Sequence, residues 1–387
     1  MKKVAIASVH WKHNHGSMLQ SLALQKALFN MEIDNEIINM NGLHPEIRKN
    51  QMPFYMRQMF NSSFIQAKMA KIKFELLYKK RVQDLDSRKQ HFNDFESHYV
   101  LSQAYKSMRE VNQACQNYSH VIVGSDQLWL PINIAGDYYT LNFVPDNIPK
   151  ISYATSFGVA DVPKRDYEKY QQFLKRIQHL SVREESGQAL IKKLTGQEAK
   201  VTCDPTLLFD ENGWETLITR KEVITDAPEK YILCYFLGGN KAHRNFVKTL
   251  KQQTGLPIVA MIHMEEYHPI DNHFADYAIT NAGPCEFINL IRNADYICTD
   301  SFHGTIFSLI HHKKFWVFKR HNDSSAMSTN TRIDSLLGRL NLQNRYLTGS
   351  ENVEKVLHQE IDYGMINTYL SSHREKSMQF LKSTLGV

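Results

Sequence analysis

The stretch Asp300–Ser308, with the sequence DSFHGTIFS, places a histidine in the setting that proton transfer needs. It follows the apolar run Tyr296–Cys298 and precedes a second apolar run, Phe315–Phe318. This order predicts a strand, a tight turn, a helix and another strand, which would bring His303 to the carboxyl edge of a parallel sheet. Open α/β sheets bind ligands at that edge, and a helix N-terminus there favours anions. The stretch therefore predicts an imidazole that moves a proton on a phosphorylated substrate, with a purely structural His303 as the open alternative.

Two further predicted strands end in polar residues. Asn14, Gly16 and Ser17 follow the first strand and open a helix, so backbone N–H groups and the Ser17 hydroxyl could face an anion. A tight structural turn is the alternative. A later strand ends in the run Gly124–Trp129, GSDQLW, whose polar groups would pair with sugar hydroxyls while the ring of Trp129 stacks on the sugar. The alternative is a turn that closes over a core tryptophan.

Cationic residues stand at two other strand or loop ends. Arg183 lies where a strand becomes a helix, and Arg332 begins a helix after a polar loop over 320–330. A guanidinium is the natural bidentate partner of a carboxylate or a phosphate. Lys319 and Arg320 are further cationic candidates. A plain surface position is the alternative for Arg332, and the alternative for Arg183 is an ion pair with Glu184, Glu185 or Asp204.

Composition narrows the class of protein. With 42% hydrophobic and 22% charged residues, the 387-residue chain is typical of a globular protein of two domains. No stretch approaches the roughly 18 apolar residues of a membrane span, and the basic start of the chain is predicted to be a first strand rather than a signal peptide. The five cysteines are widely spaced and fit neither a disulfide framework nor a zinc site, so we expect a cytoplasmic protein without a metal or a redox cofactor.

The net charge of +6 is concentrated in one segment. Between Arg48 and Gln90 there are eleven Lys or Arg against three acids, an excess of eight. A solvated helical face is one interpretation. The other is a surface that approaches anionic lipid or a phosphate-bearing substrate at the inner face of the membrane, which the interleaved aromatic and Met residues over 54–60 would suit. Nucleic acid is not expected as a partner, because no recognised binding motif accompanies the charge.

Alternating strands and helices must position these residues. The strands are predicted over 4–9, 35–40, 120–123, 151–155, 180–182 and 201–208, and again over 231–237, 258–262, 276–280, 296–299 and 315–318. Such alternation predicts an α/β fold with parallel sheets covered by helices. The polar segment 210–230 separates the two series, so we expect two doubly wound domains with the active cleft between them. Their expected bounds are 1–210, with a basic helical insertion over about 45–116, then 211–350, and helices over 351–387 that pack back across both.

Seven short motifs occur in an order and spacing that resemble the polysaccharide pyruvyl transferase family, from about residue 5 to 340. They are Asn14–Ser17 with Gln20, Gly124–Trp129, Tyr153–Gly158, Ser181–Glu184, Asp204–Leu208, Asp300–Gly304 and Arg332–Leu337. The chain departs from the family pattern at His15, where an aromatic residue is frequent, and in its longer basic insertion. Those departures bear on the acceptor more than on the donor.

The resemblance implies two Rossmann-like domains arranged as in the B-type glycosyltransferases, the first on the acceptor side and the second on the donor side. It also implies transfer of pyruvate from phosphoenolpyruvate to a saccharide as a ketal, in surface polysaccharide biosynthesis. Phosphoenolpyruvate would be a co-substrate, and the saccharide would be lipid-linked or nucleotide-linked. His303, Arg183 and Arg332 would be catalytic, and the donor would be bound by Arg183, Ser301, His303, Gly304, Arg332 and Lys319. The implied acceptor residues are Asn14, Gly16, Ser17, Ser125, Asp126, Gln127 and Trp129.

Two other functions fit the same architecture. One is a nucleotide-sugar glycosyltransferase, since it too would use Arg and Lys on phosphates. The other is a saccharide-binding relative without turnover. The donor separates the first from a pyruvyl transferase, because only the latter puts label from phosphoenolpyruvate into a glycan.

Overall fold

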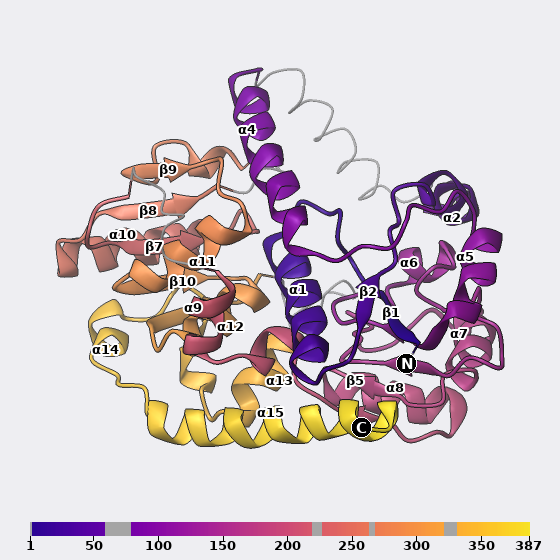
Figure 1. Cartoon of the computed structure of the whole chain (residues 1–387). Helices are drawn as coiled ribbons and strands as arrows, with labels where there is room; N and C mark the ends of the chain where they lie inside the picture. Colours follow the sequence, from indigo (N-terminus) through magenta and orange to yellow (C-terminus); the bar gives the residue numbers. More distant parts are fainter. Residues whose placement is uncertain (1, 59–78, 219–226, 263–267, 321–330) are drawn as a thin grey trace. The chain divides into compact units, whose positions relative to one another are not determined.

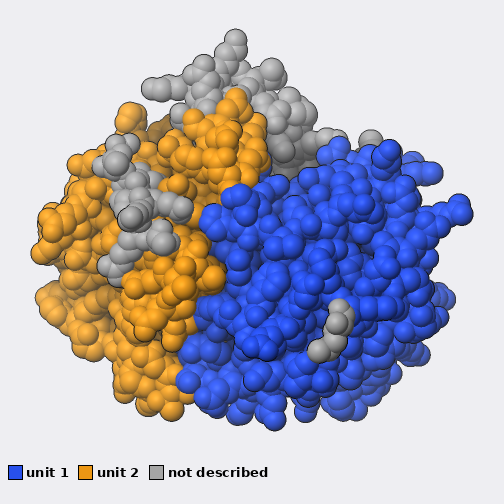
Figure 2. Space-filling model, viewed as in Figure 1, with its two compact units in different colours: residues 1–61, 96–209, 369–387 blue, residues 62–95, 210–368 orange. Residues whose placement is uncertain are grey.

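The computed structural model describes residues 2–58, 79–218, 227–262, 268–320 and 331–387 (Figure 1). The chain divides into two compact units (Figure 2). Unit 1 comprises residues 1–61, 96–209 and 369–387, and unit 2 comprises residues 62–95 and 210–368. Both are built on parallel sheets with helices, which confirms the predicted α/β class. Parts of the basic insertion, including Lys68, Lys71 and Lys73, lie outside the described residues, as do 219–226 of the expected hinge and 321–330 of the loop before Arg332.

The sheet of unit 1 has the strand order β2-β1-β3-β4. Its strands are β1 (Lys3–Ala7), β2 (Asn35–Ile37), β3 (Tyr118–Val123) and β4 (Lys150–Ser152), all parallel, with Ile6 opposite both Ile37 and Ile122. A further pair, β5 (Ser181–Val182) and β6 (Lys200–Val201), is joined to it by single bridges. The chain moves from β1 to β2 on one side and returns to β3 on the other. The carboxyl ends of β1 and β3 therefore form the switch point at which such sheets bind ligands.

Helices enclose the sheet of unit 1. They are α1 (His15–Asn30), α2 (His44–Gln58), α5 (Met108–Ala114), α6 (Pro131–Ala135), α7 (Tyr167–Lys175) and α8 (Glu185–Thr195). Val111 of α5, Phe173 of α7 and Leu190 of α8 share one core cluster with Ala5 of β1 and Val121 of β3. Val4–Ala7 of β1 and Val121–Val123 of β3 are continuous apolar runs, as is typical of parallel strands covered on both faces.

The sheet of unit 2 has the strand order β12-β11-β10-β7-β8-β9. Its strands are β7 (Ile232–Tyr235), β8 (Ile258–Met261), β9 (Tyr277–Ile279), β10 (Tyr296–Thr299), β11 (Lys314–Phe318) and β12 (Tyr346–Leu347). All are parallel, and Cys298 of β10 lies between Cys234 of β7 and Trp316 of β11. From β7 the chain adds two strands on one side and then three on the other, which is the doubly wound order. Its switch point lies at the carboxyl ends of β7 and β10.

Helices pack on both faces of this second sheet. They are α4 (Lys79–Phe95), α9 (Glu211–Leu217), α10 (Lys241–Thr254), α11 (Pro284–Asn293), α12 (Phe302–Ile310), α13 (Thr331–Arg339) and α14 (Val353–Leu357). Residues of α10 and α14 share a core cluster with Cys234, Cys298 and Trp316. On the opposite face Phe307 of α12 packs against Trp214 of α9 and Phe287 of α11. The helix α4 comes from the basic segment and packs on α11.

The last helix, α15 (Tyr363–Leu385), contributes to both units. Near its start, the Tyr363 hydroxyl donates to the backbone oxygen of Lys313 at 2.5 Å, within unit 2. Further along, Arg374 Nε donates to the backbone oxygen of Leu207 at 2.8 Å, within unit 1. The helix therefore belongs to the core of unit 2 at one end and of unit 1 at the other.

One predicted strand is wrong in part. The apolar pattern over 201–208 predicts a strand, but only Lys200–Val201 is extended, and Pro205–Leu208 form a 3₁₀ turn, η4. The turn forms because the Asp204 carboxylate accepts the backbone N–H of Thr206 at 3.0 Å and Pro205 has no N–H for a sheet.

Candidate functional site

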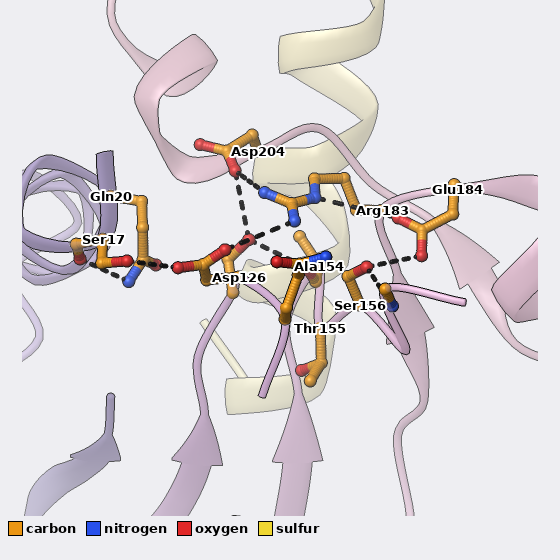
Figure 3. A network of polar contacts seen from close by, with 12 residues as sticks. Ser17, Gln20, Asp126, Ala154, Thr155, Ser156, Arg183, Glu184 and Asp204 are labelled. Carbon is orange, nitrogen blue, oxygen red and sulfur yellow. Dashed lines mark hydrogen bonds and ion pairs between the residues drawn. The ribbon is translucent and has the colours of Figure 1, made fainter. Parts of the chain in front are cut away.

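The switch point of unit 1 joins a serine to an aspartate. The Ser17 hydroxyl, in the first turn of α1, donates to Asp126 Oδ2 at 2.5 Å (Figure 3). Asn14 caps the same helix by accepting the Ser17 N–H at 3.1 Å. Asp126 follows β3 with a positive φ of 79°, and its backbone oxygen accepts the N–H of Ser156 at 2.9 Å. A left-handed aspartate fixed by its neighbours is a sparsely populated conformation of the kind that clusters at functional sites.

Arg183, which follows β5, extends into this region and is surrounded by carboxylates (Figure 3). Its Nη1 donates to Asp204 Oδ2 at 2.6 Å, its Nη2 lies 3.7 Å from Asp126 Oδ1, and its Nε lies 3.8 Å from Glu184 Oε2. Burial lowers the pKa of Arg183, but Asp204, Asp126 and Glu184 together raise it further, so the guanidinium stays charged. The ion pair with Asp204 that sequence left as an alternative is therefore present.

Hydroxyl groups hold the acidic partners of Arg183 in place. Asp204 Oδ1 accepts the Thr206 hydroxyl at 2.7 Å, and the Ser156 hydroxyl donates to Glu184 Oε1 at 2.7 Å. The exposed fractions of the side chains differ: 0% for Asp204, 2% for Glu184 and 16% for Asp126. Of the three carboxylates, Asp126 is the one that reaches the surface. A carboxylate at the surface can accept hydrogen bonds, for example from a sugar hydroxyl.

The acceptor role expected for Trp129 does not agree with the structure. Trp129 is fully buried, and its ring packs against Phe157 and Phe173 at centroid distances of 5.1 and 5.6 Å. Trp129 is therefore a core tryptophan, as in the alternative interpretation of the sequence, because the apolar rings around it exclude a sugar. Ser125 is also fully buried, and its hydroxyl donates to the backbone oxygen of Ala154 at 2.8 Å.

The other predicted acceptor residues lie at or near the switch point of unit 1. Asn14 and Ser17 meet at the start of α1, with Gly16 between them, and Ser17 contacts Asp126. Asn14, Asp126 and Gln127 are partly exposed, whereas Gly16 and Ser17 are buried. The residues that could touch an acceptor directly are therefore Asn14, Asp126 and Gln127.

At the switch point of unit 2, His303 lies at the carboxyl edge of the sheet, as predicted, but within the first turn of α12 rather than in the turn before it. Ser301 caps this helix by accepting the Gly304 N–H at 3.3 Å. A Cβ atom on Gly304 would lie only 2.6 Å from Thr299 Oγ1, so a glycine is needed for the helix to begin this close to β10. His303 is 7% exposed, and its ring lies 5.3 Å from the ring of Phe302.

Phe302 links His303 to Arg332. The guanidinium carbon of Arg332, in the first turn of α13, lies 5.3 Å from the centre of the Phe302 ring, a cation–π distance. Two residues that the resemblance names as catalytic thus contact one aromatic side chain from two helix N-termini. The sequence pattern predicts no role for Phe302, whose only signal is its place between Ser301 and His303.

Asp300 ties together the two loops of this switch point. It is 1% exposed, and its carboxylate accepts the N–H groups of Leu237 at 2.7 Å and Gly238 at 2.9 Å. Arg320 Nη2 donates to the Asp300 backbone oxygen at 2.8 Å, whereas Lys319 places its ammonium 5.3 Å from the ring of Tyr346. Arg320 therefore contacts the loops of the switch point, although the sequence marked it only as a further cationic candidate. The neighbouring Lys319 packs toward β12.

Arg183 belongs to unit 1, and His303 and Arg332 belong to unit 2. That one ligand contacts all three residues remains a prediction.

Among the described residues, no group of three or more His, Cys, Asp or Glu is arranged to hold a metal ion. In the same parts of the chain, no helix combines the length and hydropathy that crossing a bilayer requires.

Parallel sheets whose switch points carry charged and hydroxyl side chains define a ligand-binding protein of the doubly wound α/β class. The family model described as Polysaccharide pyruvyl transferase matches residues 14–322, most of the chain. The chain belongs to this family, and it is a transferase. This agrees with the resemblance of the seven sequence motifs.

No curated protein matches the chain. Among solved structures, it is similar to a UDP-GlcNAc 2-epimerase from Neisseria meningitidis bound to UDP-GlcNAc, with 12% identity, a TM-score of 0.49, and coverage of 100% of this chain and 99% of that one. A glycosyltransferase from Rickettsia africae has 12% identity, a TM-score of 0.48 and 99% coverage of both chains. The glycosyltransferase SnogD from Streptomyces nogalater has 13% identity, a TM-score of 0.45, and coverage of 98% of this chain and 95% of that one. No conclusion about function follows from likenesses of this size.

Proposed function

We propose that the protein transfers pyruvate from phosphoenolpyruvate to a saccharide, as a ketal, in surface polysaccharide biosynthesis. Family membership supports pyruvyl transfer to a polysaccharide in general. The observation that carries the rest is the grouping of His303, Phe302 and Arg332 at two helix N-termini beside a switch point. It combines a group that exchanges protons near neutral pH with a cation and with helix ends that favour anions.

In this proposal the donor binds to unit 2. Phosphoenolpyruvate carries about three negative charges near pH 7, so its site needs several positive groups. Arg332 and the N-terminus of α12 with Ser301, His303 and Gly304 are the proposed contacts, and Arg320 adds a cation at the same switch point. Lys319 remains a candidate donor ligand. It is partly exposed, so a change of rotamer could bring its ammonium group to the donor.

The proposed reaction begins when His303 delivers a proton to the methylene carbon of the donor, which becomes a methyl group. The neighbouring carbon becomes cation-like and is attacked by one sugar hydroxyl, whose proton returns to the imidazole. The bond to phosphate then breaks, and a second hydroxyl attacks the same carbon and gives its proton to the departing phosphate. The products are the ketal and inorganic phosphate, and no oxidant or metal is required.

The acceptor is assigned to unit 1. Asp126, with Asn14 and Gln127 nearby, offers acceptors and donors to sugar hydroxyls. The donor contact that the resemblance implies for Arg183 stays a prediction. The contacts of Arg183 support a second role, which is to hold the Asp126 carboxylate in place.

The saccharide is proposed to be a lipid-linked or nucleotide-linked precursor, and the protein to act in the cytoplasm at the inner face of the membrane. All five cysteines lie in the described part of the chain, where they are buried and form no disulfide, as in proteins of a reducing compartment. The basic segment after Arg48 supports the membrane contact.

The decisive experiment offers radiolabelled phosphoenolpyruvate and, separately, a labelled sugar nucleotide to the full chain with candidate saccharides. We expect label from phosphoenolpyruvate in the glycan, with a pyruvyl ketal in the mass spectrum of the product. Label from the sugar nucleotide alone would identify a glycosyltransferase and overturn the proposal.

The same assay tests the proposed acid. His303→Ala should lower kcat by about 10²-fold or more while the protein stays folded. His358→Ala is the matched control, because His358 is exposed and lies at the end of α14 in the same unit. Unchanged turnover in His303→Ala would remove the histidine from the mechanism.

A further inference from the structure

Asp300 connects the carboxyl ends of three neighbouring strands in unit 2. It follows β10, and its carboxylate accepts the N–H groups of Leu237 and Gly238, which follow β7, at 2.7 and 2.9 Å. Its backbone oxygen accepts Arg320 Nη2 at 2.8 Å, and Arg320 follows β11. The side chain of Asp300 has no exposed surface. A buried carboxylate that accepts two N–H groups is fixed in one orientation, so the loops that it joins are fixed with it.

A buried arginine holds the other side of the loop after β7. Arg244 of α10 is 2% exposed, and its Nη1 donates to the backbone oxygens of Gly238 at 2.5 Å and Asn240 at 3.4 Å. Its Nε donates to Asp271 Oδ1 at 2.9 Å, so the guanidinium is itself held in place. Gly238 is therefore bound at its N–H by Asp300 and at its C=O by Arg244.

Stability alone does not require buried charges on a loop. Burial of a charged side chain carries a desolvation penalty, and well-packed apolar side chains often give equal or greater stability. The loop Leu237–Asn240 also fits closely, since a Cβ on Gly238 would lie 3.0 Å from Arg320 Cγ and 3.2 Å from Asp300 Oδ2. This loop lies at the switch point of unit 2, where doubly wound sheets bind ligands. The buried charges thus indicate a loop whose position matters for a ligand.

We propose that Asp300 is a positioning residue for pyruvyl transfer, an inference that rests on the proposed function. Asp300 lies three residues before His303, and Ser301 between them caps α12. Its carboxylate keeps the Leu237–Asn240 loop at a constant separation from the first turn of α12, which carries the imidazole. Because Asp300 is enclosed, it acts through the loop and does not touch the donor. A misplacement of about 1 Å at a reacting group can lower a rate by about 10²-fold.

The test is the steady-state kinetics of Asp300→Asn with phosphoenolpyruvate and a saccharide that the wild type accepts. The variant keeps the size of the side chain but has one acceptor oxygen for two N–H groups. Per folded enzyme, kcat/KM for phosphoenolpyruvate should fall about 10- to 100-fold, while the KM for the saccharide, which is assigned to unit 1, stays the same. A purely structural role would reduce the amount of folded enzyme and leave the kinetics of the folded fraction unchanged.

Hydrogen exchange reports the state of the loop directly. In the wild type the amides of Leu237 and Gly238 should exchange slowly, because both donate to Asp300. In Asp300→Asn at least one of them should lose its protection. Arg244→Lys tests the same loop from its opposite side, because a lysine cannot contact both Gly238 and Asp271 as the guanidinium does. It should lower kcat/KM for phosphoenolpyruvate in the same way, and it decides the question if Asp300→Asn does not fold.

The matched control is Asp295, at the other end of the same two strands. It precedes β10, and its Oδ2 accepts the N–H of Tyr231, which precedes β7, at 3.0 Å. Asp295→Asn therefore weakens a carboxylate contact between β7 and β10 at the amino edge of the sheet. We expect it to lower thermal stability without changing kcat or either KM per folded enzyme.

Three results would overturn the inference: wild-type kinetics in Asp300→Asn, full protection of both loop amides in that variant, or an equal kinetic loss in Asp295→Asn. The failure of the proposed function gives a different result. A wild type that forms no ketal would refute that function and this inference with it, whereas a fully active Asp300→Asn would refute the inference alone.

Discussion

Arg183 is enclosed by three carboxylates, and its own side chain is only 3% exposed. The carboxylates of Asp126, Glu184 and Asp204 lie close together and repel one another. The guanidinium of Arg183 offsets this repulsion. Its effect on catalysis through Asp126 and its effect on stability are therefore linked. Measurements that separate them are needed before a loss of activity in an Arg183 variant can be interpreted.

Removal of Arg183 should destabilise unit 1. We expect Arg183→Ala to lower the free energy of unfolding by about 3–5 kcal/mol, the usual cost of leaving a buried charge unpaired. Arg176→Ala is the control, since that arginine pairs with the largely exposed Asp146. Urea unfolding measures both, and wild-type stability in Arg183→Ala would contradict the role of the ion-pair cluster.

The conservative variant then tests what Arg183 does for the substrates. Arg183→Lys keeps the charge but loses the fork that reaches Asp204 and Asp126. If Arg183 positions Asp126, the KM for the saccharide should rise while the KM for phosphoenolpyruvate stays the same. A rise in the KM for phosphoenolpyruvate alone would instead support the donor contact that the resemblance implies.

Arg332 differs from Arg183 because it is partly exposed and lies against an aromatic ring. We expect Arg332→Ala to raise the KM for phosphoenolpyruvate by about 10- to 100-fold, which corresponds to loss of one charge-assisted contact. Arg339→Ala, at the other end of α13, is the control. Steady-state kinetics at several donor concentrations would show the change, and an unchanged KM would argue against Arg332 as a donor ligand.

The short helix α12 depends on how closely its first turn approaches β10. Thr299 connects the two, since its hydroxyl donates to the backbone oxygen of Tyr235 at 2.7 Å and accepts the N–H of Ser301 at 3.0 Å. Its position leaves no room for a side chain on Gly304. The position of His303 is therefore set by the packing of a helix end on a strand end, and a change in that packing should alter catalysis.

Gly304→Ala should disturb the whole element. The added methyl would overlap Thr299 Oγ1, so α12 must shift, at an expected cost of about 1–3 kcal/mol and with lower kcat. Gly338→Ala is the matched control, because the nearest atom to a Cβ there is 4.0 Å away. Thermal unfolding and turnover of both variants test this, and a fully active, fully stable Gly304→Ala would show that the turn tolerates a side chain.

At the scale of the whole molecule, each unit contains a buried histidine that is kept neutral. Burial lowers the pKa of His10 in unit 1 and of His243 in unit 2, each to about 4. His243 packs between the rings of Phe236 and Phe318, where a charged imidazole has no water. Both units should therefore lose stability in acid.

The pH range of this loss follows from the two pKa values. In the unfolded chain a histidine takes up a proton near pH 6.5, whereas in the folded chain His243 does so only near pH 4. Stability is then complete above pH 6.5 and falls as the pH decreases from 6.5 to 4, by up to about 3 kcal/mol for each histidine. Unfolding of the wild type at pH 7, 5.5 and 4.5 should show the decline.

His243→Leu should flatten this pH dependence, while His358→Leu, at an exposed position, should not. The same slope in His243→Leu as in the wild type would show that this histidine is not responsible for the acid sensitivity.

Local pattern was enough to predict the α/β class, most strands, and the place of His303 at the carboxyl edge of a parallel sheet. Strand runs, the cap residue Ser301 and Gly304 are adjacent in the sequence, so their interactions are short-range and can be inferred from spacing. The seven motifs likewise identified the family that its model confirms over residues 14–322.

The grouping of distant residues depended on the order of the strands. Asp126, Arg183 and Asp204 follow different strands, and only the pairing of those strands brings them within reach of one another. The burial of Trp129 and the contact of Arg332 with the Phe302 ring likewise result from packing between segments far apart in the chain. Periodicity in the sequence indicates which side of a helix or strand is apolar. Whether another element covers that side, and which one, is determined by long-range contacts.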